Sequence, residues 1–220
     1  MNTRKNFDSN LNSLKEKLLD MAEKSQQAVK LAMEAFLEQN IEKAEQVTKQ
    51  DAAIDKLDVD INNQAILLIA REAPVATDLR KIIVALRIST EVERIGDMAV
   101  NIAKSTLHVG QETSSIKEVS EISKMLNIAM EMYTDSLTAY YTEDVHIAKD
   151  CADKDDLVDE LYGKIIKDLF HYIPTHPSAT NQIMQLAFIC RFIERIADHV
   201  TNISENVIYL ATGKTLSLNE

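Results

Sequence analysis

The stretch from Glu93 to Ile102 reads E-R-I-G-D-M-A-V-N-I, and the stretch from Glu194 to Ile203 reads E-R-I-A-D-H-V-T-N-I. The two copies share the pattern E-R-I-x-D-x-x-x-N-I at an offset of 101 residues. A repeat of this kind indicates that the chain contains one architecture twice. Residues four apart share one face of a helix, so each copy presents a Glu and an Asp side by side.

The composition of the chain favours an all-α fold. Only four Gly and three Pro occur in 220 residues, whereas sheets require frequent turns built from such residues. Apolar residues instead recur at helical spacing along the whole chain. We predict six long helices, at residues 8–39, 41–73, 77–109, 115–141, 144–172 and from after Pro177 to 211.

The duplication extends beyond the ten-residue repeat. The pattern D-x-x-I-D-x-L at Asp51–Leu57 matches D-x-x-V-D-x-L at Asp155–Leu161 with an offset of 104. The intervening turns absorb the difference between the two offsets, because loops tolerate insertions. The sequence therefore predicts two tandem three-helix bundles related by internal duplication, at residues 1–112 and 113–220, each with its own core.

Charge and hydropathy restrict the class of protein. The net charge of −11 disfavours a nucleic-acid partner, since phosphate binding requires clustered Lys and Arg. No apolar run approaches the ~20 residues of a membrane span, and the N-terminus lacks the apolar segment of a signal peptide. We therefore expect a cytoplasmic protein that reaches a membrane only through partners, with Cys151 and Cys190 as buried free thiols.

Acidic residues interrupt the apolar stripes of three helices. In the second helix, Asp51 stands between Val47 and Ile54 on one stripe. The stripe of the third helix leads into Glu93 and Asp97, and that of the sixth leads through Arg191 into Glu194 and Asp198. Burying unpaired carboxylates costs several kcal/mol each, so the pattern requires compensation.

Three kinds of compensation are open. The acids could lie at a solvated edge of the core, or they could pair with Arg94 and Arg195, each three residues before an Asp. Alternatively, two acidic pairs on neighbouring helices could bind a hard cation such as Mg, Ca, Mn or iron. The duplication favours the metal, because four acidic pairs at matching positions rarely arise by chance.

Enzymatic alternatives have little support in the sequence. A carboxylate-bridged di-iron enzyme would add histidines through Glu-x-x-His pairs, and neither Glu of the repeated motif is followed by a His at that spacing. We expect His199, directly after Asp198, to be a surface residue rather than a ligand. Neither a phosphate-binding P-loop nor a catalytic triad motif is present. The sequence thus favours a non-enzymatic protein, either an adaptor or a plain structural helical protein.

Three motifs resemble those of the PhoU family, the phosphate-signalling regulators of bacteria. They are P-V-A-T-D-L-R at Pro74–Arg80, R-I-S-T-E-V-E-R-I-G-D at Arg87–Asp97 and R-F-I-E-R-I-A-D-H at Arg191–His199. The resemblance covers nearly the whole chain. It is looser at the second proline turn, where Asn181 stands in place of Asp78.

The resemblance implies both a site and a role. It implies multinuclear metal clusters of iron, zinc, manganese or magnesium on the Glu/Asp-x-x-x-Asp motifs. It also implies negative control of the phosphate-starvation response and of phosphate uptake, together with the cytoplasmic subunit of the phosphate ABC transporter and a sensor histidine kinase. A homodimer is the expected assembly. The alternative within the family is an accessory protein of a low-affinity phosphate permease. The implied metal ligands are Asp51, Asp55, Glu93, Asp97, Asp155, Asp159, Glu194 and Asp198.

Overall fold

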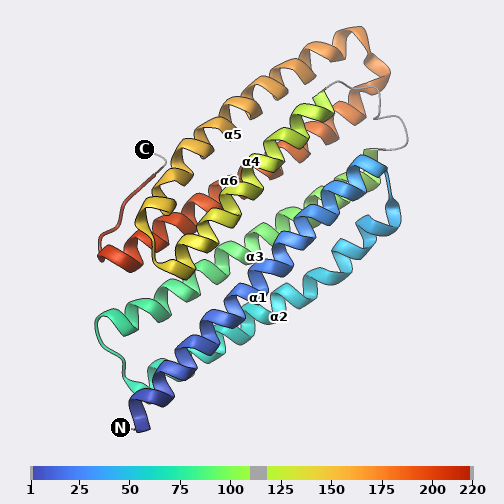
Figure 1. Ribbon diagram of the computed structural model, residues 1–220. Coiled ribbons are helices and arrows are strands. Elements are labelled where there is room, and N and C mark those ends of the chain that lie inside the picture. Colours follow the sequence, from blue (N-terminus) through green and yellow to red (C-terminus); the bar gives the residue numbers. More distant parts are fainter. Residues whose placement is uncertain (1, 110–117, 219–220) are drawn as a thin grey trace.

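The computed structural model describes residues 2–109 and 118–218, which form long helices and short turns (Figure 1). Figure 1 shows the group of helices from the first half lying beside the group from the second half, with their axes roughly aligned. The all-α prediction is confirmed. The first helix begins at Asn2, six residues before its predicted start at Asp8, and the other described helix ends lie within three residues of the predicted ones. The helices are α1 (Asn2–Glu38), α2 (Ile41–Glu72), α3 (Thr77–Val109), α4 (Glu118–Thr142), α5 (Val145–Tyr172) and α6 (Thr180–Thr212), with short 3-10 turns η2 (Ile173–Thr175) and η3 (Pro177–Ala179).

The turns that follow the first helix of each group have the same structure. Gln39 and Glu143 both adopt the left-handed conformation, with φ of 53° and 56°. Asn40 and Asp144 then cap α2 and α5 through their side-chain oxygens. The backbone hydrogen bonds that close the two turns also match: Asn40 N donates to Ala35 O at 2.8 Å, and Asp144 N donates to Ala139 O at 3.0 Å.

The turns that precede the third helix of each group differ. After α2, the left-handed residue Ala73 ends the helix and α3 starts at Thr77. After α5, the chain passes through η2 and η3 before α6 begins at Thr180. The second turn is three residues longer than the first, so the fall of the offset from 104 to 101 comes from the helices beside it. The α5 helix ends four residues sooner after Asp155 than α2 does after Asp51, and α6 begins two residues closer to Glu194 than α3 begins to Glu93.

The α3 and α6 helices form the centre of the molecule and pack against each other in antiparallel orientation. Their contact is the most extensive between any two helices in the described residues. As residue numbers rise along α3, those of the partners on α6 fall: Arg80 Nη1 donates to Leu210 O at 3.4 Å, Glu91 Oε2 lies 2.8 Å from His199 Nδ1, and Asn181 Nδ2 donates to His108 O at 3.2 Å.

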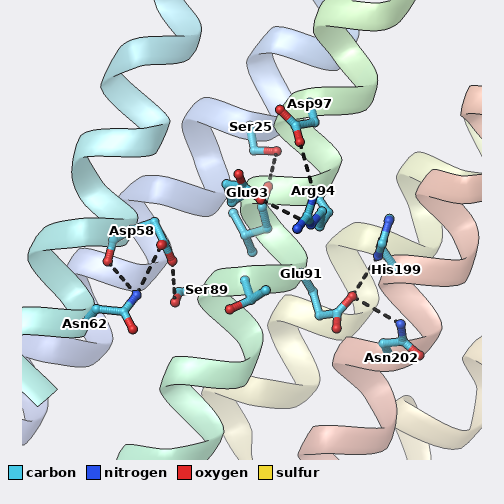
Figure 2. Close-up of polar contacts among 12 residues, drawn as sticks. Ser25, Asp58, Asn62, Ser89, Glu91, Glu93, Arg94, Asp97, His199 and Asn202 are labelled. Carbon is cyan, nitrogen blue, oxygen red and sulfur yellow. Dashed lines mark hydrogen bonds and ion pairs between the residues drawn. The ribbon is translucent and has the colours of Figure 1, made fainter. Parts of the chain in front are cut away.

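The end contacts relate the two groups by an approximate two-fold rotation. Arg80 and Asn181, which are 101 residues apart, each bind a carbonyl near the C-terminus of the other central helix. By this contact Asn181 corresponds to Arg80, whereas by its place as the second residue of its helix it corresponds to Asp78, as the proline turns suggested. The helices α1 and α4 also touch and lie behind α3 and α6 in the view of Figure 2.

The hydrophobic core is shared by the two groups. One cluster of buried apolar residues extends through all six helices, so the described residues do not form the two separate cores that the sequence suggested. The predicted boundary at 112/113 and the predicted helix start at Ser115 lie outside the described residues. Cys151 and Cys190 are buried free thiols, as predicted. In the described chain, no helix is long and apolar enough to cross a membrane.

Candidate metal centres

The eight predicted ligands gather into two groups, one in each half. The first acidic cluster combines Asp51 and Asp55 on α2 with Glu93 and Asp97 on α3. The second acidic cluster combines an equivalent set on α5 and α6, namely Asp155, Asp159, Glu194 and Asp198. Each cluster therefore depends on the packing of the second helix of its half against the third.

The acids lie at the edge of the core rather than within it. Asp155 is the exception, with 7% of its surface exposed. Asp55 and Asp159 are exposed, and the other five acids are partly buried. The stripe assigned to α3 from the sequence is also an edge: Leu86 on it is only partly buried, whereas Ile88 and Ile95 are fully buried.

A small residue lets the two helices approach closely at the first cluster. A Cβ atom on Gly96 would lie 3.2 Å from Ile54 Cδ1 and 3.7 Å from Asp51 Oδ1. In the second half the corresponding residue is Ala197, which is fully buried. Both residues stand between the Glu and the Asp of the repeat, so the motif itself holds the acids of the two helices within range of each other.

The carboxylates of the first cluster act on one another. Burial raises the pKa of Asp51, and the neighbouring charges of Asp55 and Asp97 raise it further. Burial and then Asp97 raise the pKa of Glu93, while Arg94 opposes this effect. Asp97 lies on α3 and Asp51 on α2, so the carboxylates of the two helices interact electrostatically across the helix contact.

The second cluster shows the same effect more strongly. Burial, followed by the charges of Asp159 and Asp198, raises the pKa of Asp155 to about 6. Burial and Asp198 also raise the pKa values of Asp159 and Glu194. The carboxylates of the second cluster therefore disfavour one another's charge, and a cation would relieve this repulsion.

Ion pairing of these acids occurs, although only one of the two predicted arginines takes part. The nearest nitrogen–oxygen distance from Arg94 to Asp97 is 3.6 Å, as is that from Arg94 to Glu93. In the described part of the chain, Arg195 forms no ion pair with Asp198. In the second copy of the motif the ion pair is made instead by Arg191, which pairs with Glu194 three residues later.

Asp58 adds a further charge beside the first cluster (Figure 2). Its carboxylate accepts hydrogen bonds from Ser89 Oγ at 2.8 Å and from Asn62 Nδ2 at 3.1 Å, and its charge contributes to the raised pKa of Glu93. These two bonds hold Asp58 in place, so we assign it a supporting role. Its place on the α2 stripe was visible in the sequence, whereas its partners were not.

His199 is not the surface residue that the sequence suggested. Its side chain is 16% exposed and lies between the halves, with Nδ1 2.8 Å from Glu91 Oε2 (Figure 2). Asn202 Nδ2 donates to the same oxygen at 3.1 Å. His199 therefore joins α6 to α3.

The acids suit a metal in chemistry and position, although their side chains do not converge on one point. Across residues 2–109 and 118–218, no three His, Cys, Asp or Glu side chains are arranged to hold one ion as they stand. One oxygen of the second cluster, Glu194 Oε2, is nonetheless buried without a hydrogen-bond partner. Buried polar atoms without partners are rare, and a cation or water at this place would satisfy this oxygen.

Comparison with known proteins places these features in one family. A model of the PhoU domain matches residues 18–106 and again residues 122–207. The chain is 40% identical over 220 residues to a Clostridium acetobutylicum protein named phosphate-specific transport system accessory protein PhoU homolog, a match that covers 99% of this chain and all of that protein. It is also 40% identical over 204 residues to a protein of the same name from Aquifex aeolicus, covering 93% of this chain and 92% of that protein.

Solved structures agree with this assignment. The crystal structure of PhoU from Pseudomonas aeruginosa matches with a TM-score of 0.90 and 29% identity, over 94% of this chain and all of that one. The phosphate transport system regulatory protein PhoU from Streptococcus pneumoniae matches with a TM-score of 0.89 and 26% identity, over 96% and 99% of the two chains. With its domain matched twice and relatives aligned along nearly their whole length, the chain belongs to the PhoU family.

Proposed function

We propose that this protein is a non-enzymatic, metal-binding adaptor that restrains the phosphate-starvation response and phosphate uptake. The observation that carries the proposal is the pair of acidic clusters, each built from two helices and each with carboxylates that raise one another's pKa. The relatives are named accessory proteins of the phosphate-specific transport system, which supports a role in phosphate transport.

The eight clustered acids are the residues that would hold the metal. A bound cation would supply positive charge among carboxylates that repel one another, and oxygen ligands of this kind suit magnesium and manganese best and also serve iron and zinc. Metal content of protein purified without chelator tests this assignment. Glu93→Gln with Asp97→Asn should empty the first cluster only, and Glu194→Gln with Asp198→Asn the second only. Unchanged metal content in both variants would remove these residues as ligands.

We further propose that the protein acts in the cytoplasm as a homodimer and reaches the membrane through partners. These partners would be the cytoplasmic subunit of the phosphate ABC transporter and a sensor histidine kinase. Two bundles with long charged helix faces offer broad surfaces for protein contacts. Co-purification with each tagged partner, followed by light scattering of the isolated protein, tests the contacts and the dimer.

Gene deletion tests the regulatory role. In phosphate-rich medium, deletion should raise expression of phosphate-starvation genes and phosphate uptake, and the wild-type chain should reverse both effects. Starvation genes that stay silent, with uptake unchanged, would contradict this role and favour an accessory protein of a low-affinity permease. A folded variant that lacks both clusters yet still represses would show that metal is not part of the signal.

A further inference from the structure

A guanidinium accompanies each acidic cluster, although the two arginines are not copies of each other. The offset of 101 relates Arg94 to Arg195 and relates Arg191 to Thr90. Arg94 pairs in the first half and Arg191 in the second. Each cluster therefore has a guanidinium paired with at least one of its carboxylates, although the two arginines occupy different positions of the repeat.

In each pair the carboxylate side chain is more buried than the arginine side chain. The Glu194 side chain is 12% exposed and that of Arg191 is 50% exposed. The Glu93 side chain is 28% exposed and that of Arg94 is 54% exposed. An exposed guanidinium loses little on return to water, whereas a buried carboxylate left alone would be strongly destabilised.

Each arginine–carboxylate pair is formed within one helix, whereas each acidic cluster is built from two helices. Arg94 lies on the same helix as Glu93 and Asp97, and Arg191 lies on the same helix as Glu194, so α3 and α6 make these pairs by themselves. A cation held by a whole cluster would need ligands from two helices. The arginine therefore occupies carboxylates that a metal ion would use, without needing the second helix.

We propose that Arg94 and Arg191 are the counterions of the metal-free clusters and that a divalent cation competes with them for the same carboxylates. This inference rests on the proposed metal binding. A bound cation neutralises Glu93, Asp97 and Glu194, which removes their attraction for the guanidinium groups and adds repulsion at short range. Metal loading then releases two guanidiniums to the surface of an otherwise acidic chain.

Arg195 provides a matched control for the two arginines. Arg195→Gln makes the same change in net charge as Arg94→Gln or Arg191→Gln, on an exposed residue that forms no ion pair with a cluster in the described chain. All three variants are titrated with Mn²⁺ as full-length, metal-free protein. Backgrounds carrying Glu194→Gln with Asp198→Asn, or Glu93→Gln with Asp97→Asn, assign each affinity to one cluster.

Arg94→Gln should tighten Mn²⁺ binding at the first cluster, and Arg191→Gln at the second. Loss of a half-exposed ion pair implies roughly a two- to fivefold decrease in Kd, whereas Arg195→Gln should leave both clusters near wild type. Equal affinities in all three variants, or weaker binding after loss of Arg94 and Arg191, would overturn the proposal. Absence of Mn²⁺ binding by the wild-type chain would instead contradict the proposed function.

A second measurement reports the displacement directly. Addition of diamagnetic Zn²⁺ should shift the ¹⁵Nε resonances of Arg94 and Arg191 toward values for free guanidinium and leave that of Arg195 in place. Unshifted Arg94 and Arg191 resonances in protein that has bound Zn²⁺ would refute displacement, whatever the variants show. Thermal melts in chelator establish that each variant is folded before it is titrated.

Discussion

Asp155 is the most buried of the eight acids, and replacing it with asparagine should stabilise the metal-free protein. Burial and the charges of Asp159 and Asp198 raise its pKa from 3.8 to about 6. Each pKa unit corresponds to about 1.4 kcal/mol, so this shift places the cost of the charged form at up to about 3 kcal/mol. Asparagine keeps the shape of the side chain and removes the charge.

The sign of the effect sets its pH dependence. Because the pKa is higher in the folded state, Asp155 binds its proton more tightly there than in the unfolded chain. Its favourable contribution is complete below about pH 4, declines as the pH rises through about 6, and is absent above that range. Asp155→Asn escapes this decline, so its advantage over wild type should grow from about pH 4 and level off near neutrality.

Thermal melts of chelated protein followed by circular dichroism test this prediction. At about pH 7.5 the variant should melt higher than wild type by up to roughly 6–12 °C, for about 3 kcal/mol in a chain of this size. Saturating metal should reverse the order, because wild type gains a ligand that the variant lacks. Asp153→Asn, on an exposed residue of the same helix, controls for net charge. An unchanged or lower melting temperature for chelated Asp155→Asn would refute the reasoning.

Three further predictions follow from the same geometry. Chelation should lower the melting temperature of metal-loaded wild type, since a metal at a hundredfold excess over its Kd contributes about 2.7 kcal/mol; an unchanged value would favour arginine pairing alone. Gly96→Val should push α2 from α3 at Ile54 and weaken metal binding at the first cluster only, and equal loss at both clusters would contradict this local effect. Calorimetry and circular dichroism should report one unfolding transition because the core is continuous, whereas two separated transitions would show independent halves.

Much of the fold was predictable because its determinants are local. Asn40 caps α2 and Gly213 ends α6 in the left-handed conformation, and both breaks were apparent in the sequence. The acidic clusters were predictable for a related reason. Four-residue spacing on helices that pack together leaves few arrangements, and the repeat showed which helices correspond.

The contact between the halves could not be predicted in this way. Glu91 and His199 are 108 residues apart, and neither position carries a local pattern that identifies the other. The sequence assigned the wrong residues to the buried stripe of α3. This helix contacts α1, α2 and α6, so its buried surface covers a wide arc. Apolar residues around a wide arc fit a heptad pattern in more than one phase. The choice between Arg191 and Arg195 depends on side-chain direction, which spacing alone leaves open.

The antiparallel pairing of α3 with α6 has a consequence for the origin of the chain. A half-length ancestor would expose the face of α3 that α6 now covers, and two identical copies could have covered it for each other across an isologous two-fold interface. Fusion would then have freed the two sides to diverge. Glu91 and His199 now form a polar contact, whereas the residues related to them by the offset of 101 are Phe192 and Met98. A symmetric dimer must carry every substitution on both sides of its axis, and a single chain is released from that constraint.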